Sequence, residues 1–403
     1  MTTNLQAATD AYLHLIPVAK EASAIAYTRG GHWILLWSKL ISCAIAVILA
    51  RFSLTGPIQN IARRADRPNR SAFLLSLSIL LGYSVLIAPW FSYAEWARER
   101  SYGFTSEAFG TWLSQYLVQS LVSDFVGALL LTAFYAAARK SGRVWWIWGT
   151  AFAAIGMFLA LIVQPVLLSP LLNNYKPAPS GGIRDAVETV LARAGGSGDR
   201  VLVYDGSRQS SRYTATVTGI GSSATVMLSD TMLAKGADIA EVKAVVAHEL
   251  GHQRHNHSLI LLTILTAIVG SGLLLTDRLF PVVAKMMGMS PQTSVSDPQG
   301  LPVLLAIFAL FTLLSTPLVN TAQRLVEADA DRFGLDLAQE PDGMARAVIA
   351  AADYRASRPT AAEEALFYDH PSNARRIADA MRWKAAHEAA TAHPLDQHDR
   401  KSR

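Results

Sequence analysis

The sequence predicts a multi-pass α-helical membrane protein with an additional α+β region outside the membrane. Hydrophobic residues make up 51% of its 403 residues and charged residues only 17%, against roughly 25% charged residues in an average soluble domain. The hydrophobic residues are gathered in blocks long enough to cross a bilayer. A β-rich segment between the fourth and fifth blocks supplies the second part of the fold.

Six apolar blocks are long enough to form membrane helices, and tryptophans at several of their ends fit the aromatic belt of a membrane interface. The blocks are residues 33–50, 72–90, 117–138, 145–168, 259–275 and 301–318. The fifth and sixth are close to the shortest length that spans, so a buried helical hairpin is the alternative for them. Lys39 and Asp124 lie within the first and third blocks. Either Lys39 reaches the interface or the two side chains pair in a polar chamber.

The region between the fourth and fifth blocks has the patterns of both helix and sheet. A linker rich in Pro, Gly and Asn at residues 170–182 leads into a helical stretch at 183–194. Three β-rich runs follow at residues 200–205, 213–218 and 224–229, and glycines at 219 and 221 separate the last two.

These patterns divide the chain into six parts. They are an N-terminal segment (1–32), a four-helix membrane region (33–172), a region with the β-rich segment and a motif-bearing helix (173–258), a two-helix membrane hairpin (259–320), a C-terminal helical region (321–392) and a disordered tail (393–403).

Net charge, cysteine content and the N-terminal sequence limit the kinds of partner and targeting signal that this chain can have. The net charge of +5 comes from basic residues in short loops, which are typical of membrane-topology determinants and make no case for nucleic acid binding. Cys43 is the single cysteine, so no intramolecular disulfide is possible. Residues 1–30 do not have the pattern of a signal peptide, so we expect the first span to direct membrane insertion.

The most informative motif is His248-Glu249-Leu-Gly-His252, within a helical run from Glu241. Two histidines four residues apart share one helix face and can bind a single Zn²⁺, while the adjacent glutamate can polarise the water on the metal. The motif therefore predicts one Zn²⁺ per chain. The alternative is a surface helix that carries two histidines by chance.

A hydrolytic zinc site needs a third protein ligand and one open position for water. Ten residues after His248, where metzincins have their third histidine, this chain has Ser258. His255 lies about 10 Å along the helix from His248, too far to share one ion with both motif histidines. We interpret His255 and His257 as polar residues at the membrane surface.

Glu327 and Asp331 provide a better third ligand. They are four residues apart, so they share a helix face just after the sixth block. Glu327 can bind the metal, while Asp331 can accept a hydrogen bond from the outer nitrogen of a ligating histidine. The alternative is a solvated acidic face. The fifth and sixth blocks form a hairpin, so both motif helices should emerge on one side, about 10–14 Å beyond the spans.

This arrangement predicts a zincin-like, gluzincin-type site. His248, His252 and Glu327 would hold the metal, and Glu249 would take a proton from water and pass it to a leaving amine. The oxyanion that forms needs a further donor. His370 and Arg376, in a His-Pro segment that leads into a basic helix, are the candidates.

Together these elements resemble the membrane zinc endopeptidases of peptidase family M48, which include type I CAAX prenyl proteases and HtpX-type heat-shock proteases. The matching features, in order, are a β-rich segment, His248-Glu-Leu-Gly-His252 with a later His257, the Arg324…Glu327…Ala330-Asp331 element and the His370-Pro…Arg376 element. Upstream, Glu99-Arg-Ser-Tyr-Gly-Phe104 and Pro170-Leu-Leu-Asn173 resemble loops of the CAAX branch. The resemblance covers most of residues 10–380.

The resemblance implies that Glu327 is a zinc ligand, that Asp331 supports the ligands from outside, that His370 stabilises the transition state and that Arg376 supports it. It also implies that a peptide adds as a strand beside Thr214-Ala215, where the family typically has Asn-Ala. This chain shows six spans where the CAAX branch usually has seven. Its four spans before the catalytic region are more than the HtpX type has.

The expected function is therefore an integral-membrane metalloendopeptidase that acts on peptides or membrane proteins within the lipid bilayer, in the manner of CAAX-box protein processing. An HtpX-like quality-control protease is the alternative. A catalytically silent scaffold or transporter with a structural metal would not need Glu249. A site-two-type intramembrane protease would have an apolar zinc helix, whereas residues 253–257 are polar.

The cell location and the side of the active site rest on two further observations. The composition, rich in alanine and arginine, suggests a bacterial inner membrane. Basic loops at residues 51–70 and 139–143 lie opposite the catalytic side, and the positive-inside rule would make them cytoplasmic. The family resemblance instead implies a cytoplasmic active site, and we favour that orientation.

Overall fold

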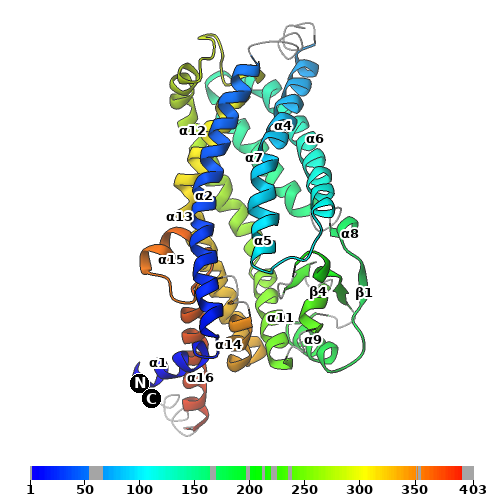
Figure 1. Ribbon diagram of the computed structural model, residues 1–403, viewed down its shortest axis with the longest axis vertical. Coiled ribbons are helices and arrows are strands. Elements are labelled where there is room, and N and C mark those ends of the chain that lie inside the picture. Colours follow the sequence, from blue (N-terminus) through cyan, green and yellow to red (C-terminus); the bar gives the residue numbers. More distant parts are fainter. Residues whose placement is uncertain are drawn as a thin grey trace, which may run out of the picture. The chain divides into compact units, whose positions relative to one another are not determined.

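A computed structural model describes residues 2–53, 67–163, 169–196, 200–210, 214–218, 225–234, 238–350, 352 and 355–392. The chain forms two compact units (Figure 1). The first unit consists of Met1–Gly30, Asn174–Ser258 and Asn320–Arg403, and the second of Gly31–Asn173 and Leu259–Val319. The predicted disordered tail from residue 393 lies outside the described residues.

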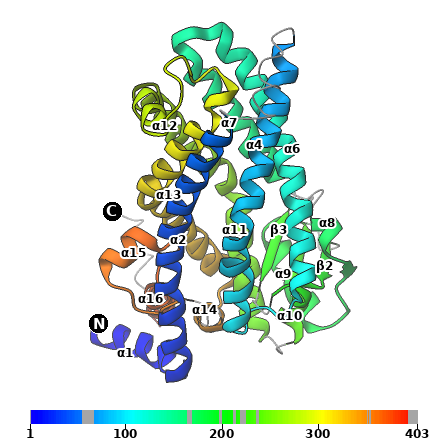
Figure 2. The same cartoon turned by 45° about the horizontal axis from the view of Figure 1, so that its top comes forward.

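Long apolar helices dominate the second unit, although residues 18–30, 257–258 and 320–338 of three of them belong to the first unit. They are α2 (Val18–Ser53), α4 (Pro68–Phe91), α6 (Phe109–Ser141), α7 (Trp145–Val163), α12 (His257–Met286) and α13 (Leu301–Ala338). Shorter elements are η1 (Ser92–Ala97, a π-helix), α5 (Arg98–Ser101), η2 (Gly142–Val144), α8 (Ser169–Leu172) and η6 (Pro298–Gly300). Helix α4 packs along α6, and α6 along α7 (Figures 1 and 2).

Five helical segments in the described part of the chain are long and apolar enough to cross a membrane. One of them, Phe109–Val163, contains both α6 and α7. Gly142 separates these two helices with a φ of +53°, a conformation that favours glycine. All six predicted blocks fall within helices, apart from residues 164–168, which lie outside the described residues.

Helices α12 and α13 contain the fifth and sixth blocks and are long and apolar enough to span a membrane. They are 30 and 38 residues long, and about 20 residues are enough to span a bilayer. The described residues show no ion pair between Lys39 and Asp124. Asp124 instead accepts a hydrogen bond from Ser84 Oγ at 2.9 Å, which satisfies its carboxylate from a neighbouring helix.

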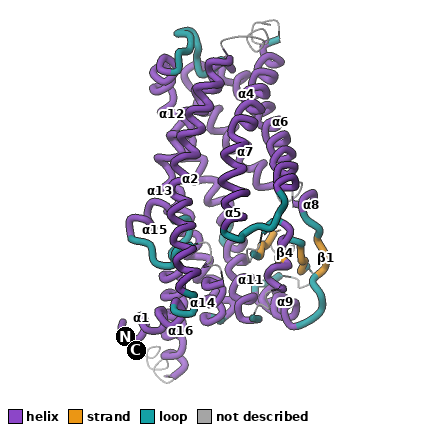
Figure 3. Tube along the Cα trace, viewed as in Figure 1, coloured by secondary structure: helices purple, strands orange, loops and turns teal. Residues whose placement is uncertain are grey.

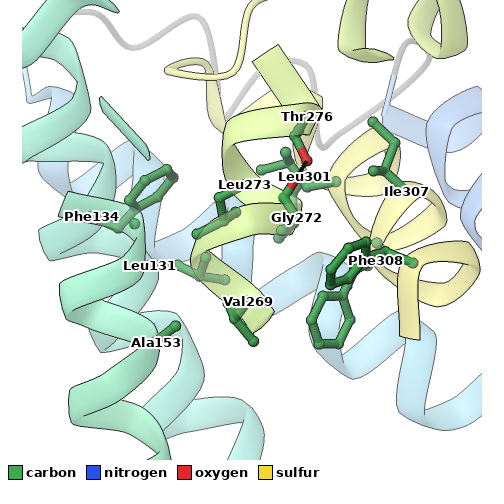
Figure 4. A pocket seen from close by; sticks show the side chains of 14 residues that line it. Leu131, Phe134, Ala153, Val269, Gly272, Leu273, Thr276, Leu301, Ile307 and Phe308 are labelled. Atoms are coloured by element: carbon green, nitrogen blue, oxygen red, sulfur yellow. Dashed lines mark hydrogen bonds between the residues drawn. The ribbon is translucent and has the colours of Figure 1, made fainter. Parts of the chain in front are cut away.

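An apolar cavity of about 220 Å³ lies among α6, α7, α12 and α13 of the second unit. Figure 4 shows Leu131, Phe134, Leu273 and Phe308 around it, with Thr276 as the polar side chain labelled there. Glycines keep the cavity walls close, because a Cβ at Gly272 would meet the Phe311 ring at 2.7 Å.

The first unit contains a four-stranded sheet with the order β1-β2-β4-β3. Its strands are β1 (Tyr175–Pro177), β2 (Val201–Tyr204), β3 (Ala215–Thr218) and β4 (Thr225–Ser229), shown in orange in Figure 3. β2 and β4 are parallel, and β1 and β3 pair antiparallel with them as the two edges. The three predicted β-rich runs are confirmed, although residues 200, 205 and 214 lie just outside the strands. Residues 213, 219–221 and 224 lie outside the described residues.

Strand β1 corrects one interpretation of the sequence. Residues 170–182 were expected to be a linker, but Tyr175–Pro177 pairs with β2 in the register Tyr175 to Tyr204. Asp205 fixes this edge, because its carboxylate accepts hydrogen bonds from the backbone and side-chain nitrogens of Asn174 at 2.7 and 2.9 Å. A three-residue edge strand has too little alternation to stand out in a sequence.

Helices complete the first unit, and some of them pack against the sheet. They are α1 (Thr2–Leu13), α9 (Gly182–Arg193), α10 (Asp230–Ala234), α11 (Ile239–Arg254), α14 (Pro341–Ala350), α15 (Ala361–Phe367) and α16 (Asn373–Ala392), with the short η4 (Gly206–Arg208). A core between the sheet, α9 and α11 buries residues such as Val190, Leu191, Val226 and Leu228 completely. Each such side chain contributes roughly 1.5–3 kcal/mol.

Candidate metal centre

Helix α11 places the motif histidines on one face. Asp238 caps its N-terminus by accepting a hydrogen bond from the Ala240 nitrogen at 2.9 Å, which satisfies one of the free amides there. Four residues of spacing bring the Nε2 atoms of His248 and His252 within 3.0 Å of each other. Both rings therefore present the same nitrogen to one point in space.

Helix α13 brings Glu327 to the same point. Glu327 Oε2 lies 3.3 Å from His248 Nε2, and Glu327 Oε1 lies 3.5 Å from His252 Nε2. The ligand atoms of the three residues all lie within 4.8 Å of one another. The structure thus brings together the three predicted metal ligands, which come from segments 75 residues or more apart in the sequence.

Two glycines allow α11 and α13 to approach closely enough for this. A Cβ at Gly251 would meet Ala330 Cα at 3.1 Å, and a Cβ at Gly334 would meet the His248 nitrogen at 3.0 Å. Both values are shorter than ordinary carbon contacts. Glycine in the middle of a helix normally costs about 0.5–1 kcal/mol relative to alanine, so these positions were a sequence signal for a close helix crossing.

Asp331 lies behind His248, one helical turn beyond Glu327. Its Oδ1 lies 2.8 Å from His248 Nδ1, the ring nitrogen that faces away from Glu327. Arg376 on α16 donates two hydrogen bonds to the same carboxylate, at 2.7 and 2.6 Å. This bidentate pair fixes the plane of the Asp331 carboxylate, and the carboxylate in turn fixes the orientation of the His248 ring.

His370 approaches from the loop between α15 and α16. Its Nε2 lies 3.3 Å from Glu327 Oε2, and its Nδ1 lies 2.9 Å from Asp369 Oδ1. Arg355 donates to that same Asp369 oxygen at 2.9 Å. Arg324 on α13 holds the preceding segment by donating to backbone carbonyls at the end of α15. The second half of the predicted site, His370 and Arg376, therefore also lies beside Glu327 and Asp331.

The charges around the ligands favour a cation. Burial opposes a positive charge on His248, but the neighbouring carboxylates of Asp331 and Glu327 outweigh it and raise the pKa of the imidazole to about 10. Burial also raises the pKa of Glu249 above its usual range, although the neighbouring histidines oppose this. A carboxyl group with a raised pKa is suited to accept and release a proton near neutrality.

The donor set also fits a metal by its hydrogen bonding. Glu327 Oε2 is buried and accepts no hydrogen bond within the described residues, although two histidine nitrogens lie 3.3 Å away. A buried carboxylate oxygen without a partner is costly. A cation among the three ligand atoms would satisfy it. Two imidazoles and one carboxylate are the donors found in catalytic zinc sites with an open position.

The predicted substrate-binding residues lie at an edge of the sheet. Thr214 immediately precedes β3, and Ala215 is its first residue. The Thr214 oxygen accepts a hydrogen bond from the Ser229 nitrogen at 3.0 Å, which ties it to β4. The other side of β3 has no neighbouring strand among the described residues. Strand β3 also packs against α11, so this free edge belongs to the same unit as the motif histidines.

Sequence reasoning missed three side chains around the site. Asp369 and Arg355, which hold His370, belong to no recognisable spacing pattern because they are joined only by the fold. His257 was expected to be a polar surface residue, but it is buried and its Nδ1 lies 3.0 Å from His252 Nδ1. Among the described residues, the exposed His255 groups with His257 and Asp329, whereas His248 and His252 group with Glu327.

Comparison with known families agrees with this geometry. Residues 177–384 match the model of peptidase family M48, and residues 6–174 match a model described as the CAAX prenyl protease N-terminal region with five membrane helices. Within residues 6–174 the described part of this chain has four long helices, α2, α4, α6 and α7.

Individual relatives have low sequence identity to this chain, and their names agree with the family match. The uncharacterized metalloprotease YhfN of Bacillus subtilis is 24% identical over 268 residues, which cover 66% of this chain and 62% of YhfN. CAAX prenyl protease 1 of Saccharomyces cerevisiae is 26% identical over 226 residues, which cover 55% of this chain and 47% of the yeast protein. The chain thus spans about half to two thirds of the lengths of these relatives.

A solved structure shares the fold. The crystal structure of S. mikatae Ste24p superposes with a TM-score of 0.67 and 19% sequence identity, covering 93% of this chain and 94% of that one. Helices with the composition of membrane spans and the match to the membrane-helix region together make this an integral membrane protein. The family model covers β2, β3, β4, the motif helix and every candidate site residue, so the chain belongs to peptidase family M48.

Proposed function

We propose that this protein is a zinc-dependent integral-membrane endopeptidase. One observation carries the proposal: the ligand atoms of His248, His252 and Glu327 converge, and Glu249 follows His248 on the same helix. A purely structural metal site has no use for a carboxyl group in this position beside its ligand.

The proposed cofactor is one Zn²⁺ per chain. His248 and His252 would bind it through Nε2, and Glu327 through its carboxylate. When bound, zinc supplies Lewis acidity that polarises a carbonyl group and makes a coordinated water far more acidic than bulk water. The rest of the reaction falls to the side chains of the protein.

We assign the proton transfers to Glu249. Its carboxylate would take the proton of the attacking water and give it to the amine that leaves. His370 Nε2, held by Asp369 and Arg355, is placed to donate a hydrogen bond to an oxygen that gains charge near Glu327. Arg376 acts indirectly: it fixes the Asp331 carboxylate, which in turn orients the His248 ring.

Peptide binding is assigned to the free edge of β3. An extended peptide can add to an exposed strand through main-chain hydrogen bonds, which makes affinity largely independent of side-chain identity. Thr214 and Ala215 are the residues at the start of that edge. Peptides and segments of membrane proteins are therefore the proposed substrates.

The proposed physiological role is processing of C-terminal CAAX-type motifs. Its support is the match of residues 6–174 to the CAAX prenyl protease N-terminal region and the names of several relatives. Comparing membrane proteomes of cells that carry wild type or Glu249→Gln tests the substrate class. Accumulation of a few uncleaved, C-terminally lipidated proteins is expected, whereas broad accumulation of damaged membrane proteins would indicate quality control instead.

Metal removal tests the proposed chemistry. We expect a strong chelator to abolish peptide hydrolysis by the detergent-purified protein and stoichiometric Zn²⁺ to restore it. His252→Ala should not recover at the same zinc concentration, since it lacks one ligand. Full hydrolysis by protein with no detectable metal would overturn the proposal.

A further inference from the structure

We propose that His257 and Asp329 are positioning residues that hold His252 in the tautomer that binds the metal. This inference rests on the proposed metal site and extends it beyond the ligands. The spacing of His252 and His257 does not indicate this role, because residues five apart do not share one face of a continuous helix. In the structure His257 begins a new helix, α12. Asn256, with a φ of +54°, breaks the helix between His252 and His257 and redirects the chain.

Distances connect the three side chains in a line. His252 Nδ1 lies 3.0 Å from His257 Nδ1, and His257 Nε2 lies 3.1 Å from Asp329 Oδ2. His255 Nδ1 contacts the same Asp329 oxygen from the exposed side. His257 itself is 3% exposed, so its two ring nitrogens depend on these protein partners for their hydrogen bonds.

Counting protons fixes the direction of each hydrogen bond. The Nε2 of His252 faces His248 and Glu327, so in a metal-binding ring that nitrogen carries the lone pair and Nδ1 carries the proton. His252 Nδ1–H must therefore donate to His257 Nδ1. That leaves the proton of a neutral His257 ring on Nε2, where it donates to Asp329.

The same count argues against a second metal at His255, His257 and Asp329, although their ligand atoms also lie within 4.8 Å of one another. A metal on His257 Nε2 would displace the proton that the Asp329 hydrogen bond requires. Its Nδ1 would still have to accept from His252, and the ring would then carry a negative charge. One metal per chain, with a relay of hydrogen bonds from His252 through His257 to Asp329 outside it, is consistent with the contacts among His252, His255, His257 and Asp329.

Two substitutions at position 257 separate the two hydrogen bonds. In His257→Asn the side-chain oxygen occupies the place of Nδ1 and can still accept from His252. In His257→Gln the terminal amide occupies the place of Nε2 and can still donate to Asp329, but no acceptor faces His252. If His257 accepts a hydrogen bond from His252 and donates one to Asp329, the two variants should differ in metal affinity. If His257 only fills space, their metal affinities should be equal.

Zinc affinity of the full-length protein, measured by competition with a chromophoric chelator at fixed pH, is the readout. We expect His257→Gln to weaken zinc binding about 10- to 100-fold, as loss of an outer partner typically does, and His257→Asn to weaken it much less. Asp329→Ala, at a half-exposed position, should also weaken it. His387→Asn, at an exposed position on α16, is the control and should bind as wild type.

The outcomes separate this proposal from the metal site itself. Wild type that binds no zinc would overturn the proposed cofactor. Wild type that binds one zinc, with equal loss in His257→Asn and His257→Gln, would overturn the relay alone. Two zinc ions per wild-type chain and one in Asp329→Ala would replace the relay with a second metal site.

Discussion

At the scale of single residues, each motif histidine is held from behind by a different partner. His248 is tied through Nδ1 to Asp331, and His252 through Nδ1 to His257. Such outer contacts set the tautomer and the angle of a ligating ring, and they raise its basicity. The metal centre therefore depends on residues that never touch the metal, and Arg376 is the clearest of them.

We predict that Arg376→Ala lowers zinc affinity about 10- to 100-fold, because it removes both hydrogen bonds that fix the Asp331 carboxylate. Arg376→Lys should recover only part of the loss, since an ammonium group cannot make the bidentate contact. A chelator competition titration measures both variants. Equal affinity of wild type and Arg376→Ala would show that Asp331 keeps its position unaided.

Asp369 gives a prediction about pH. Burial opposes its charge, but hydrogen bonds with His370 and Arg355 outweigh it and hold its pKa at about 2, against about 3.9 in an unfolded chain. A carboxylate with a lowered pKa stabilises the fold above the unfolded value, and this contribution disappears as pH falls from about 4 to about 2. Its half-exposed side chain limits the effect to about 1 kcal/mol.

The stability difference between wild type and Asp369→Asn should therefore shrink as pH falls from 6 to 3. Thermal unfolding in detergent at several pH values measures it. A difference that stays constant over this range would contradict the assignment.

At the scale of elements, the site depends on how closely α11 and α13 cross. Gly251 and Gly334 leave no side chain between the helices, which brings Glu327 within reach of both histidines. Close crossings of this kind convert two independent helical motifs into one site. Packing at such a crossing tolerates little added volume.

We predict that Gly334→Ala lowers the free energy of unfolding by about 1–3 kcal/mol, the usual cost of overpacking, and weakens zinc binding as well. Its Cβ would meet the His248 nitrogen at 3.0 Å. Gly110→Ala is the matched control, because it is also helical and its Cβ would meet nothing within 4 Å. The control should be unchanged or slightly more stable. Equal stability of the two variants would contradict a tight crossing.

Elements with strong periodicity were predictable from the sequence. The apolar blocks, the strands β2, β3 and β4 and the pairs His248–His252 and Glu327–Asp331 follow from spacing. The β1 strand did not, because three residues carry no pattern. The interruption at Asn256 was also missed. Helix α11 ends at Arg254 and α12 begins at His257, so the motif helix and the fifth span are separate helices.

At the scale of the whole molecule, the two units draw on segments that alternate along the chain. The unit with the sheet and the metal centre receives residues from three separate stretches. Nothing local in the sequence predicts that Arg376, near the C-terminus, contacts Asp331 behind a motif that begins at His248. The resemblance indicated that both residues belong to the site, but it did not indicate that they contact each other, as they do in the fold.

Membrane orientation is the prediction that belongs to this scale. Five of the six predicted spans separate residue 67 from residue 385, so the two positions should face opposite sides of the membrane. With Cys43 replaced by serine, we expect Arg67→Cys to react with an impermeant thiol reagent from outside intact cells. Ala385→Cys should react only after the membrane is opened. The reverse pattern would place the catalytic side outside, as the basic loops favour.

The central claim is that this metal site hydrolyses peptide bonds with Glu249 as its base. Peptide hydrolysis by Glu249→Gln, measured beside its zinc content, tests it most directly. We predict one zinc per chain, as in wild type, and a rate at least about 100-fold lower, the usual contribution of a general base. A variant that binds zinc and still cleaves peptides at a rate close to that of wild type would contradict the account.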